Sequence, residues 1–326
     1  MIPLSILDLV PIREGCDVSQ ALAETAALAK VAEDAGYKRF WTAEHHGADG
    51  LAGAAASVVL AHIGHATSTI RIGSGGIMLP NHNPLVIAEQ FGTLDALFPG
   101  RIDLGLGRAP GADRRIAHAL RKDLMRAAEE FPQDVVELRE RFAADPHVQF
   151  RSTPGAGAAV EMWLLGSSLF GAQLAAHLGM PYAFASHFAP TLLDQALATY
   201  RENFQPSETL DQPRAMVAMT VVAAETDDEA RVLASSMDQS FIDFRTGRSN
   251  KLKPPVPGFR DSLPADAVAM LEQARAVSAV GSPATVRADM EKFIERTQAD
   301  EIIVSGSVFD QDARHRSLAL TMEALG

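Results

Sequence analysis

The chain is poor in cysteine and in positive charge. Its 326 residues include a single cysteine, Cys16, so no disulfide can form within the chain. This composition fits a reducing compartment, and we expect a cytoplasmic protein. Lysine and arginine number 29 against 41 aspartates and glutamates, which gives a formal net charge of -12. Because nucleic acids and anionic membranes bind basic surfaces, we expect neither of them as a partner.

Long hydrophobic runs are also absent. No segment approaches the ~20 consecutive apolar residues that a membrane-spanning helix needs. Residues 1–8 carry no basic side chain and are too short for a signal peptide. Hydrophobic residues make up 47% and charged residues 21%, the balance of an ordinary globular protein.

What is present is a regular alternation of strand and helix patterns. Short apolar and β-branched segments predict eight strands, and segments rich in alanine and leucine predict the helices between them. The predicted strands are residues 4–9, 37–43, 70–78, 101–107, 160–165, 182–186, 214–224 and 301–305. The predicted helices are residues 18–36, 53–67, 84–98, 112–144 with a break near Pro132, 169–178, 190–204, 227–244, 265–277 and 311–325.

Eight buried strands joined by helical crossovers predict an α/β fold, a single-domain (β/α)₈ TIM barrel over residues 1–326. A doubly wound open sheet is the alternative. That fold normally carries a glycine-rich fingerprint after its first strand, and residues 8–11 (Asp-Leu-Val-Pro) do not resemble one. The proline-rich residues 246–264 form an insertion between the seventh and eighth strands. We interpret it either as a surface insertion or as a mobile lid over the barrel mouth.

In such a barrel the functional groups gather at the carboxyl ends of the strands. Those ends are polar or rich in glycine here, and they comprise Asp8, residues 44–46, Gly75 and Gly76, residues 105–108, residues 166–168, residues 186–187 and residues 305–307. The amino-terminal strand ends, at Leu4, Lys38, Arg39, Ile70 and Val160, hold nothing comparable. We therefore predict one large ligand site on a single rim.

Two of these strand ends suggest a particular chemistry. Glu44, His45 and His46 place a carboxylate beside two imidazoles, which can exchange protons near neutral pH, although a plain surface turn is the alternative. Gly75 and Gly76 weaken the third strand. They fit a flat ligand against the backbone or an unusual peptide geometry, with tight packing inside the barrel as the alternative.

A third strand end predicts a site for a phosphate. Gly166, Ser167 and Ser168 form a turn that opens a helix, where backbone N–H groups and two hydroxyls can bind an anion. Arg108, just past the fourth strand, can add a cation. Serine is also a common helix cap, so only the combination of these groups on one rim indicates a phosphate site.

Taken together, these motifs resemble a known family. Residues 44–46, 75–84, 105–108 and 165–168 are similar in order and spacing to bacterial luciferase-like flavin monooxygenases, along nearly the whole chain. The resemblance implies a barrel that binds reduced FMN, which reacts with O₂ to oxidise a small organic substrate. Electrons would come from NAD(P)H directly or from a separate flavin reductase. The absence of a nicotinamide fingerprint favours the reductase.

The resemblance also implies roles for individual residues. His45 matches a histidine that acts as general acid or base, and we expect both His45 and Glu44 to be catalytic. Gly75–Gly76 matches a pair joined by a non-proline cis peptide bond next to the flavin ring. The positions that match the phosphate-binding ones are Arg108, Gly166, Ser167 and Ser168. The luciferase catalytic chain has a carboxylate where Ser167 stands, so that contact is altered here.

A homodimer is implied as well. His46 and Glu89 match a pair that meets across the subunit interface in that family. The expected dimer contact is therefore the pair of helices at residues 53–67 and 84–98.

We also expect Asp8, His82 and His187 to line the rim or contact substrate. No group of histidine, cysteine or carboxylate residues has the spacing of a metal site, so we predict none. The alternative functions are a deazaflavin-dependent hydride-transfer oxidoreductase, a flavin-binding protein without turnover, and a barrel lyase without flavin.

Overall fold

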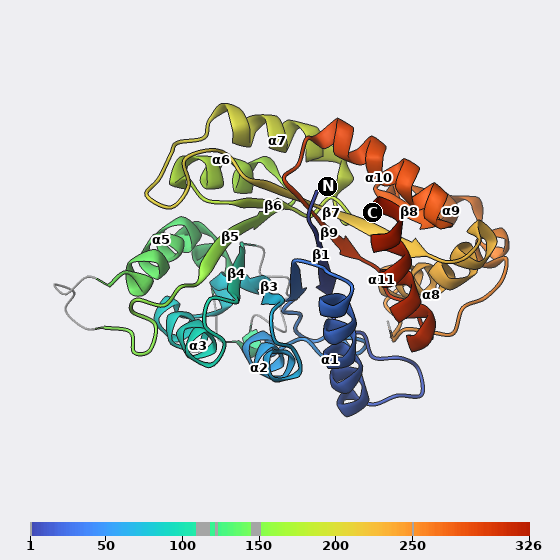
Figure 1. The fold of residues 1–326 in the computed structure, drawn as a ribbon, viewed down its shortest axis with the longest axis horizontal. Coiled ribbons are helices and arrows are strands. Elements are labelled where there is room, and N and C mark those ends of the chain that lie inside the picture. The colour runs from blue at the N-terminus through green and yellow to red at the C-terminus, as the bar shows by residue number, and fades with distance from the viewer. Residues whose placement is uncertain (1, 109–117, 121–122, 145–150, 250) are drawn as a thin grey trace.

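Parallel strands close into a barrel at the centre of the molecule. The computed structural model describes residues 2–108, 118–120, 123–144, 151–249 and 251–326. The strands are β1 (Leu4–Asp8), β2 (Arg39–Thr42), β3 (Arg71–Met78), β4 (Ile102–Gly107), β5 (Glu161–Gly166), β6 (Tyr182–Phe184), β7 (Ala215–Ala223), β8 (Ser278–Gly281) and β9 (Glu301–Ser305). Neighbouring strands pair from β1 through β7, and β7 pairs with β9, which pairs with β1 (Figure 1). The predicted (β/α)₈ barrel is confirmed.

Helices cover the outside of this barrel (Figure 1). They are α1 (Val18–Asp34), α2 (Ala56–Ala66), α3 (Pro84–Leu97), α5 (Leu124–Phe142), α6 (Leu169–Leu178), α7 (Leu193–Glu202), α8 (Asp227–Arg245), α9 (Ala265–Ala274), α10 (Pro283–Thr297) and α11 (Gln311–Leu325), with short 3₁₀ turns η1 (Leu79–Asn81), η2 (Pro190–Leu192) and η3 (Phe259–Ser262). Within the described part of the chain, no helix is both long and apolar enough to cross a membrane.

The predicted helix break near Pro132 is wrong. Helix α5 runs through Pro132 without interruption. Phe131, Val135 and Leu138 lie on its buried face, and this packing against the barrel offsets the backbone hydrogen bond that proline cannot make. The predicted helical residues 112–117 lie outside the described residues.

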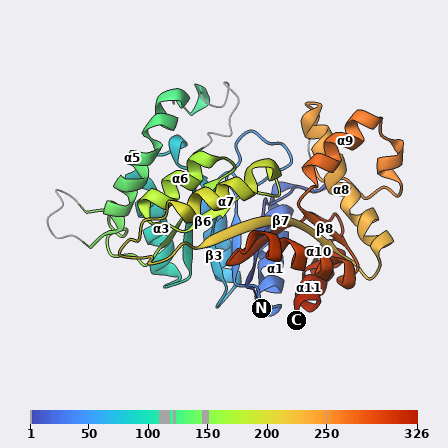
Figure 2. The same cartoon turned by 90° about the horizontal axis from the view of Figure 1, so that it is seen from above.

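The sequence patterns miss β8 and α10. Strand β8 has four residues and pairs with Thr220–Ala223 of β7, beyond the three residues of β7 that pair with β6. Such a short strand, with a small residue at three of its positions, gives no alternating pattern to recognise. The predicted place of the insertion is confirmed, since α8, η3, α9, β8 and α10 all lie between β7 and β9. Figure 2 shows α8 and α9 at the opposite end of the molecule from α5.

The proline-rich residues 246–264 contact the loop that follows β1. The backbone N–H of Leu252 donates to the Ile12 carbonyl at 2.9 Å, and the N–H of Glu14 donates to the Leu252 carbonyl at 2.7 Å. The side chain of Lys253 pairs with Asp243 of α8 at 2.6 Å. These contacts hold the segment beside the carboxyl end of β1, and its proposed mobility stays a prediction.

Tryptophan packing explains the glycines of β3. Trp41 and Trp163 meet edge to face inside the barrel, with ring centroids 5.7 Å apart. A Cβ atom at Gly75 would lie 2.8 Å from a methyl group of Leu7 and 3.0 Å from Trp41, and one at Gly73 would lie 2.9 Å from the Trp41 indole nitrogen. Packing inside the barrel therefore requires glycine at these two positions. A ligand against the backbone is not needed to explain them.

The amino-terminal end of the barrel contains a buried ion cluster, so the expectation that these strand ends hold nothing comparable is wrong. Arg39, 1% exposed, lies 2.8 Å from Asp103, 2.8 Å from Glu301 and 3.3 Å from Glu161. Its guanidinium also stacks 5.0 Å from the Trp163 ring. Because strand residues alternate, Arg39 points inward like Trp41. These charges pair with one another and close the barrel end away from the predicted rim.

Candidate functional site

The carboxylate of Glu44 connects the carboxyl ends of β2 and β3. It is 1% exposed. Nε2 of His46 lies 2.6 Å from Oε1, Nε2 of His82 lies 2.8 Å from Oε2, and the N–H of Met78 donates to Oε2 at 3.1 Å. The backbone N–H of Glu44 donates to the Gly76 carbonyl at 3.2 Å. One side chain therefore fixes two imidazoles and the segment that follows β3.

Glu44 is ionised in this setting. Burial alone would raise its pKa, but the hydrogen bonds and charge from His82, followed by the contacts with His46 and the Met78 N–H, bring the pKa below its ordinary value. With both oxygens already bonded, the carboxylate orients imidazoles and has no surface to offer a reactant. These contacts favour a positioning role for Glu44, and the catalytic role expected from the sequence stays a prediction.

The same three side chains place possible metal ligands together. One ligand atom each from Glu44, His46 and His82 lies within 4.8 Å of the others. Spacing along the chain does not reveal this group, because His82 belongs to the loop after another strand. The Nε2–oxygen distances of 2.6–2.9 Å are those of hydrogen bonds. We interpret the group as a hydrogen-bonded trio, and the absence of a metal stays a prediction.

His45 differs from its neighbours because Glu44 does not hold it. Its Nδ1 atom is buried without a hydrogen-bond partner of good geometry. Burial lowers the pKa of the ring, against smaller opposing effects from the Ala43 carbonyl and the Glu44 charge. The imidazole is therefore neutral at pH 7 and can accept a proton.

The peptide bond between Gly75 and Gly76 is cis, as the family resemblance implied. The β3–β4 register shifts at this point, between Gly75 and Ile77. A Cβ atom at Gly76 would lie 2.4 Å from Leu165 and 2.6 Å from the Gly105 carbonyl, so no side chain fits there. The backbone next to the Glu44 hydrogen bonds therefore carries no side chain at Gly75 or Gly76.

A set of anion-binding groups gathers at the start of α6. Ser167 and Ser168 are exposed, and Ser168 is the N-cap residue although its side chain makes no capping hydrogen bond. The Arg108 guanidinium stacks 4.0 Å from the ring of Phe170, in the first turn of α6. At Gly166, a Cβ atom would lie 2.9 Å from the Tyr182 hydroxyl, so glycine is needed for this turn. Guanidinium, hydroxyls and helix N–H groups form the donor set that a phosphate requires.

Pro132 is a site residue that the sequence patterns did not identify. Nε of Arg108 donates to the Ala128 carbonyl of α5 at 3.2 Å. In an α-helix this carbonyl would accept from the N–H of residue 132, and proline has none. The proline therefore leaves the Ala128 carbonyl available to accept from Arg108 and to hold its side chain toward α6. A proline inside a helical pattern is visible in the sequence. It predicts a helix break, however, and does not show that Arg108 is the partner of the carbonyl.

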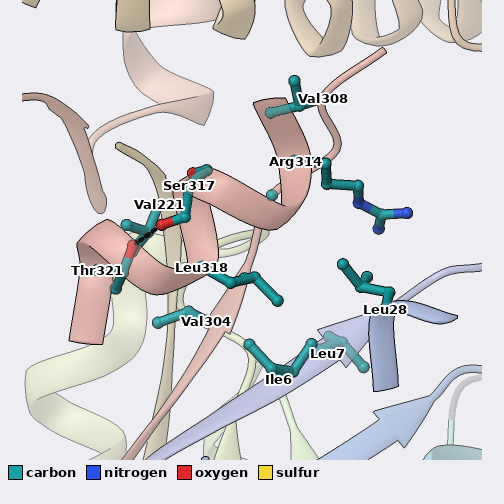
Figure 3. Close-up of a pocket in the computed structure, with 11 residues that line it drawn as sticks. Ile6, Leu7, Leu28, Val221, Val304, Val308, Arg314, Ser317, Leu318 and Thr321 are labelled. Carbon is teal, nitrogen blue, oxygen red and sulfur yellow. Dashed lines mark hydrogen bonds between the residues drawn. The ribbon is translucent and has the colours of Figure 1, made fainter. Parts of the chain in front are cut away.

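The prediction that Asp8 lies at the substrate rim is wrong. Its carboxylate is 1% exposed and accepts from Arg314 at 2.6 Å and from Thr25 at 2.7 Å. Since β1 residues alternate, Asp8 points outward between α1 and α11, away from the barrel interior. The cavity beside Arg314, about 10 Å³ and lined by apolar residues such as Leu28 and Leu318, holds no more than one water molecule (Figure 3).

The remaining predicted residues keep their proposed roles as predictions. His187 is half-buried after β6, and burial, followed by the charge of Arg275, lowers its pKa to about 4. His82 is bound to Glu44 and thus lies near the rim. Glu89 lies on α3, and the predicted contact between His46 and Glu89 of a second subunit is untested.

Comparison with known proteins identifies the family. The model of the luciferase-like monooxygenase family matches residues 2–301. The chain belongs to the luciferase-like monooxygenase family. A protein of Escherichia coli K12 named luciferase-like monooxygenase is 48% identical over 323 residues, covering 99% of this chain and 96% of its own. The N-acetyl-S-alkylcysteine monooxygenase of Bacillus subtilis is 36% identical over 261 residues, 76% of this chain and 75% of its own.

Solved structures agree with the family assignment. Apo-MsnO8 superposes with a TM-score of 0.88 at 34% identity, over 100% of this chain and 98% of that one. Two more distant structures share the fold. The oxygenating constituent of 3,6-diketocamphane monooxygenase from Pseudomonas putida, in complex with FMN, has a TM-score of 0.77 at 18% identity over 99% of this chain and 98% of that one. An F420-dependent secondary alcohol dehydrogenase has a TM-score of 0.72 at 15% identity over 100% and 99%.

The Glu44 trio generates a pH-dependent prediction. We expect Glu44→Gln to lower the free energy of unfolding at pH 7 by about 2–3 kcal/mol, because charged hydrogen bonds are lost from a buried site. Since folding lowers the pKa of Glu44, its contribution is complete above its unfolded pKa of about 4.5 and is lost as pH falls through the folded pKa. Urea unfolding of both proteins from pH 7 to pH 3 measures the difference. A difference that stays constant or grows toward low pH would contradict this account.

Proposed function

We propose that this luciferase-like monooxygenase uses reduced FMN and O₂ to oxidise a small organic substrate. The observation that carries the proposal is the stacking of the Arg108 guanidinium on Phe170, which lies in the first turn of α6 just after the N-cap residue Ser168. A guanidinium, two hydroxyls and the N–H groups of a ten-residue helix suit the phosphate of a flavin nucleotide. When bound, the flavin would supply the electrons and the reaction with O₂.

The protein groups have separable tasks in this proposal. Arg108, Ser167, Ser168 and the α6 N–H groups would hold the phosphate. Glu44 keeps the ends of β2 and β3 in place, and His45 offers a half-buried, neutral imidazole that can exchange a proton. The apolar barrel interior around Trp41 and Trp163 would exclude water from the inner side of the site.

A deazaflavin-dependent oxidoreductase is the second candidate. It is favoured by the fold shared with the F420-dependent alcohol dehydrogenase. The 36% identical relative that is named as a monooxygenase favours a reaction with O₂. A separate flavin reductase would then deliver the reduced cofactor, and a cytoplasmic location would suit both proteins. A flavin-binding protein without turnover fits less well, because His45 serves no structural hydrogen bond of good geometry.

The phosphate assignment predicts a difference between two flavins. Arg108→Gln should weaken FMN about 10- to 100-fold, because a charged hydrogen bond is lost, and should leave riboflavin, which has no phosphate, unchanged. Pro132→Ala should weaken FMN in the same selective way, because the N–H of residue 132 then competes for the Ala128 carbonyl. Removing a proline from a helix should also stabilise the fold.

Fluorescence titration with FMN, riboflavin and F420 measures these affinities. Arg126→Gln, an exposed arginine of α5 paired with Glu130, is the matched control and should change neither affinity. Equal losses for FMN and riboflavin in Arg108→Gln would remove the phosphate assignment. Tighter binding of F420 than of FMN would favour the second candidate.

His45 generates a kinetic prediction. We expect His45→Ala to slow the O₂-dependent reoxidation of bound reduced FMN by about 100-fold, as is typical for loss of a general acid or base. Because burial lowers the pKa of His45, the wild-type rate should persist below pH 6.5 before it falls. Stopped-flow absorbance from pH 5 to pH 8 measures both effects, with His177→Ala, an exposed histidine of α6, as control. Equal rates for His45→Ala and wild type would exclude a catalytic role.

We also propose that two copies of the chain associate through α2 and α3. Large apolar side chains are exposed there, namely Val58 at 68%, Val86 at 44% and Leu97 at 51%. An apolar surface of this kind is common at interfaces between identical subunits.

Sedimentation velocity tests this homodimer. Wild type should sediment as a dimer, and Leu97→Glu as a monomer, because a charge would be buried in an apolar interface. Val18→Glu is the matched control, since Val18 is equally exposed at 51% but lies at the start of α1. A monomeric wild type, or a dimeric Leu97→Glu variant, would refute the proposed interface.

A further inference from the structure

A second, larger cavity lies in the insertion between β7 and β9. Its volume is about 740 Å³, and α8, η3, α9, β8 and α10 form its walls. Folded interiors contain few voids larger than a water molecule, and small-molecule sites typically measure about 300–1,000 Å³. A hollow of this size is large enough to hold a small organic molecule. None of the residues assigned above to the flavin site lines it.

One corner of the cavity carries excess positive charge. Asp238 of α8 is 2% exposed, and its two oxygens accept from Nε of Arg260 at 2.7 Å and from Nε of Arg275 at 3.1 Å. One buried carboxylate thus fixes two guanidiniums, which leaves a net charge of +1. Both arginines use Nε for this contact. Within the described residues, their Nη groups have no acceptor among the hydrogen bonds found.

Other charged side chains also line the cavity, away from the Asp238 corner. Asp228 is paired with Arg231, at 2.5 Å on the surface of α8. Asp261 and Glu272 are exposed, so water screens their charge. Asp289 of α10 also lines the cavity and is half-buried. The excess positive charge is therefore confined to the buried Asp238 corner, and carboxylates line other parts of the wall.

Apolar side chains form the rest of the wall. They come from three different elements and include Val232, Val256, Phe259 and Val280. Inorganic phosphate could bind the guanidiniums but would leave these side chains facing water. A carboxylate with a hydrocarbon tail would use both, because its head group accepts from paired guanidiniums while the tail covers the apolar wall.

We propose that this cavity binds an organic carboxylate of medium chain length, with its head group at Arg260 and Arg275. The proposal does not rest on the proposed flavin site, although Arg275 lies near enough to His187 for its charge to act on that ring. Isothermal titration with octanoate tests the proposal. We expect one site per chain with a dissociation constant below about 1 mM. Octanol, octylammonium and inorganic phosphate should each bind at least tenfold more weakly.

Variants locate the binding. Arg260→Gln should weaken octanoate at least tenfold and should fold normally, because the Arg260 side chain is 45% exposed. Arg231→Gln, in the same cavity but paired with Asp228, should change the affinity less than twofold. Because Arg260 lines only this cavity among the sites described, a loss of affinity confined to Arg260→Gln places the binding here rather than at the barrel mouth. No saturable binding of octanoate, equal binding of octanol, or an unchanged affinity in Arg260→Gln would overturn the proposal.

Discussion

The buried carboxylate of Glu44 is the constraint on which the proposed active site depends. A charged group that is 1% exposed must be hydrogen-bonded, and its partners here come from the loop after β2, from the end of β3 and from the segment after η1. Two imidazoles and the Met78 backbone therefore have their positions set by a single side chain. His45, the neighbour that Glu44 does not hold, has a half-buried ring and is the residue to which we assign the chemistry.

The same physical logic recurs at the other functional points. The Ala128 carbonyl, left without a helical donor by Pro132, accepts from Arg108 and directs its guanidinium onto the first turn of α6. At the opposite end of the barrel, Arg39 is surrounded by carboxylates, and this buried ion cluster fills that end of the barrel. Both ends contain charge. At the Arg39 end arginines and carboxylates pair with one another, whereas at the Arg108 end the guanidinium, the Ser167 and Ser168 hydroxyls and the α6 N–H groups form the proposed phosphate site.

Sequence patterns could predict the barrel because strand and helix periodicity repeats eight times along the chain. They missed β8, whose four residues carry no periodicity, and they placed Asp8 at the rim, because a pattern does not tell which way the last residue of a strand points. The motif residues 44–46 and 166–168 were found by their position at strand ends. The contact between Glu44 and His82, and the role of Pro132, depend on contacts between separate elements, which spacing along the chain does not contain.

The central claim is that the rim formed by the ends of β2 to β5 holds FMN. A crystal of the protein soaked with FMN tests it most directly. The account predicts that the phosphate accepts from Arg108, Ser168 and the N–H groups at the start of α6, and that the isoalloxazine ring lies beside His45 and the Gly75–Gly76 peptide. A flavin bound elsewhere on the chain, or a phosphate without contact to Arg108 and α6, would contradict it.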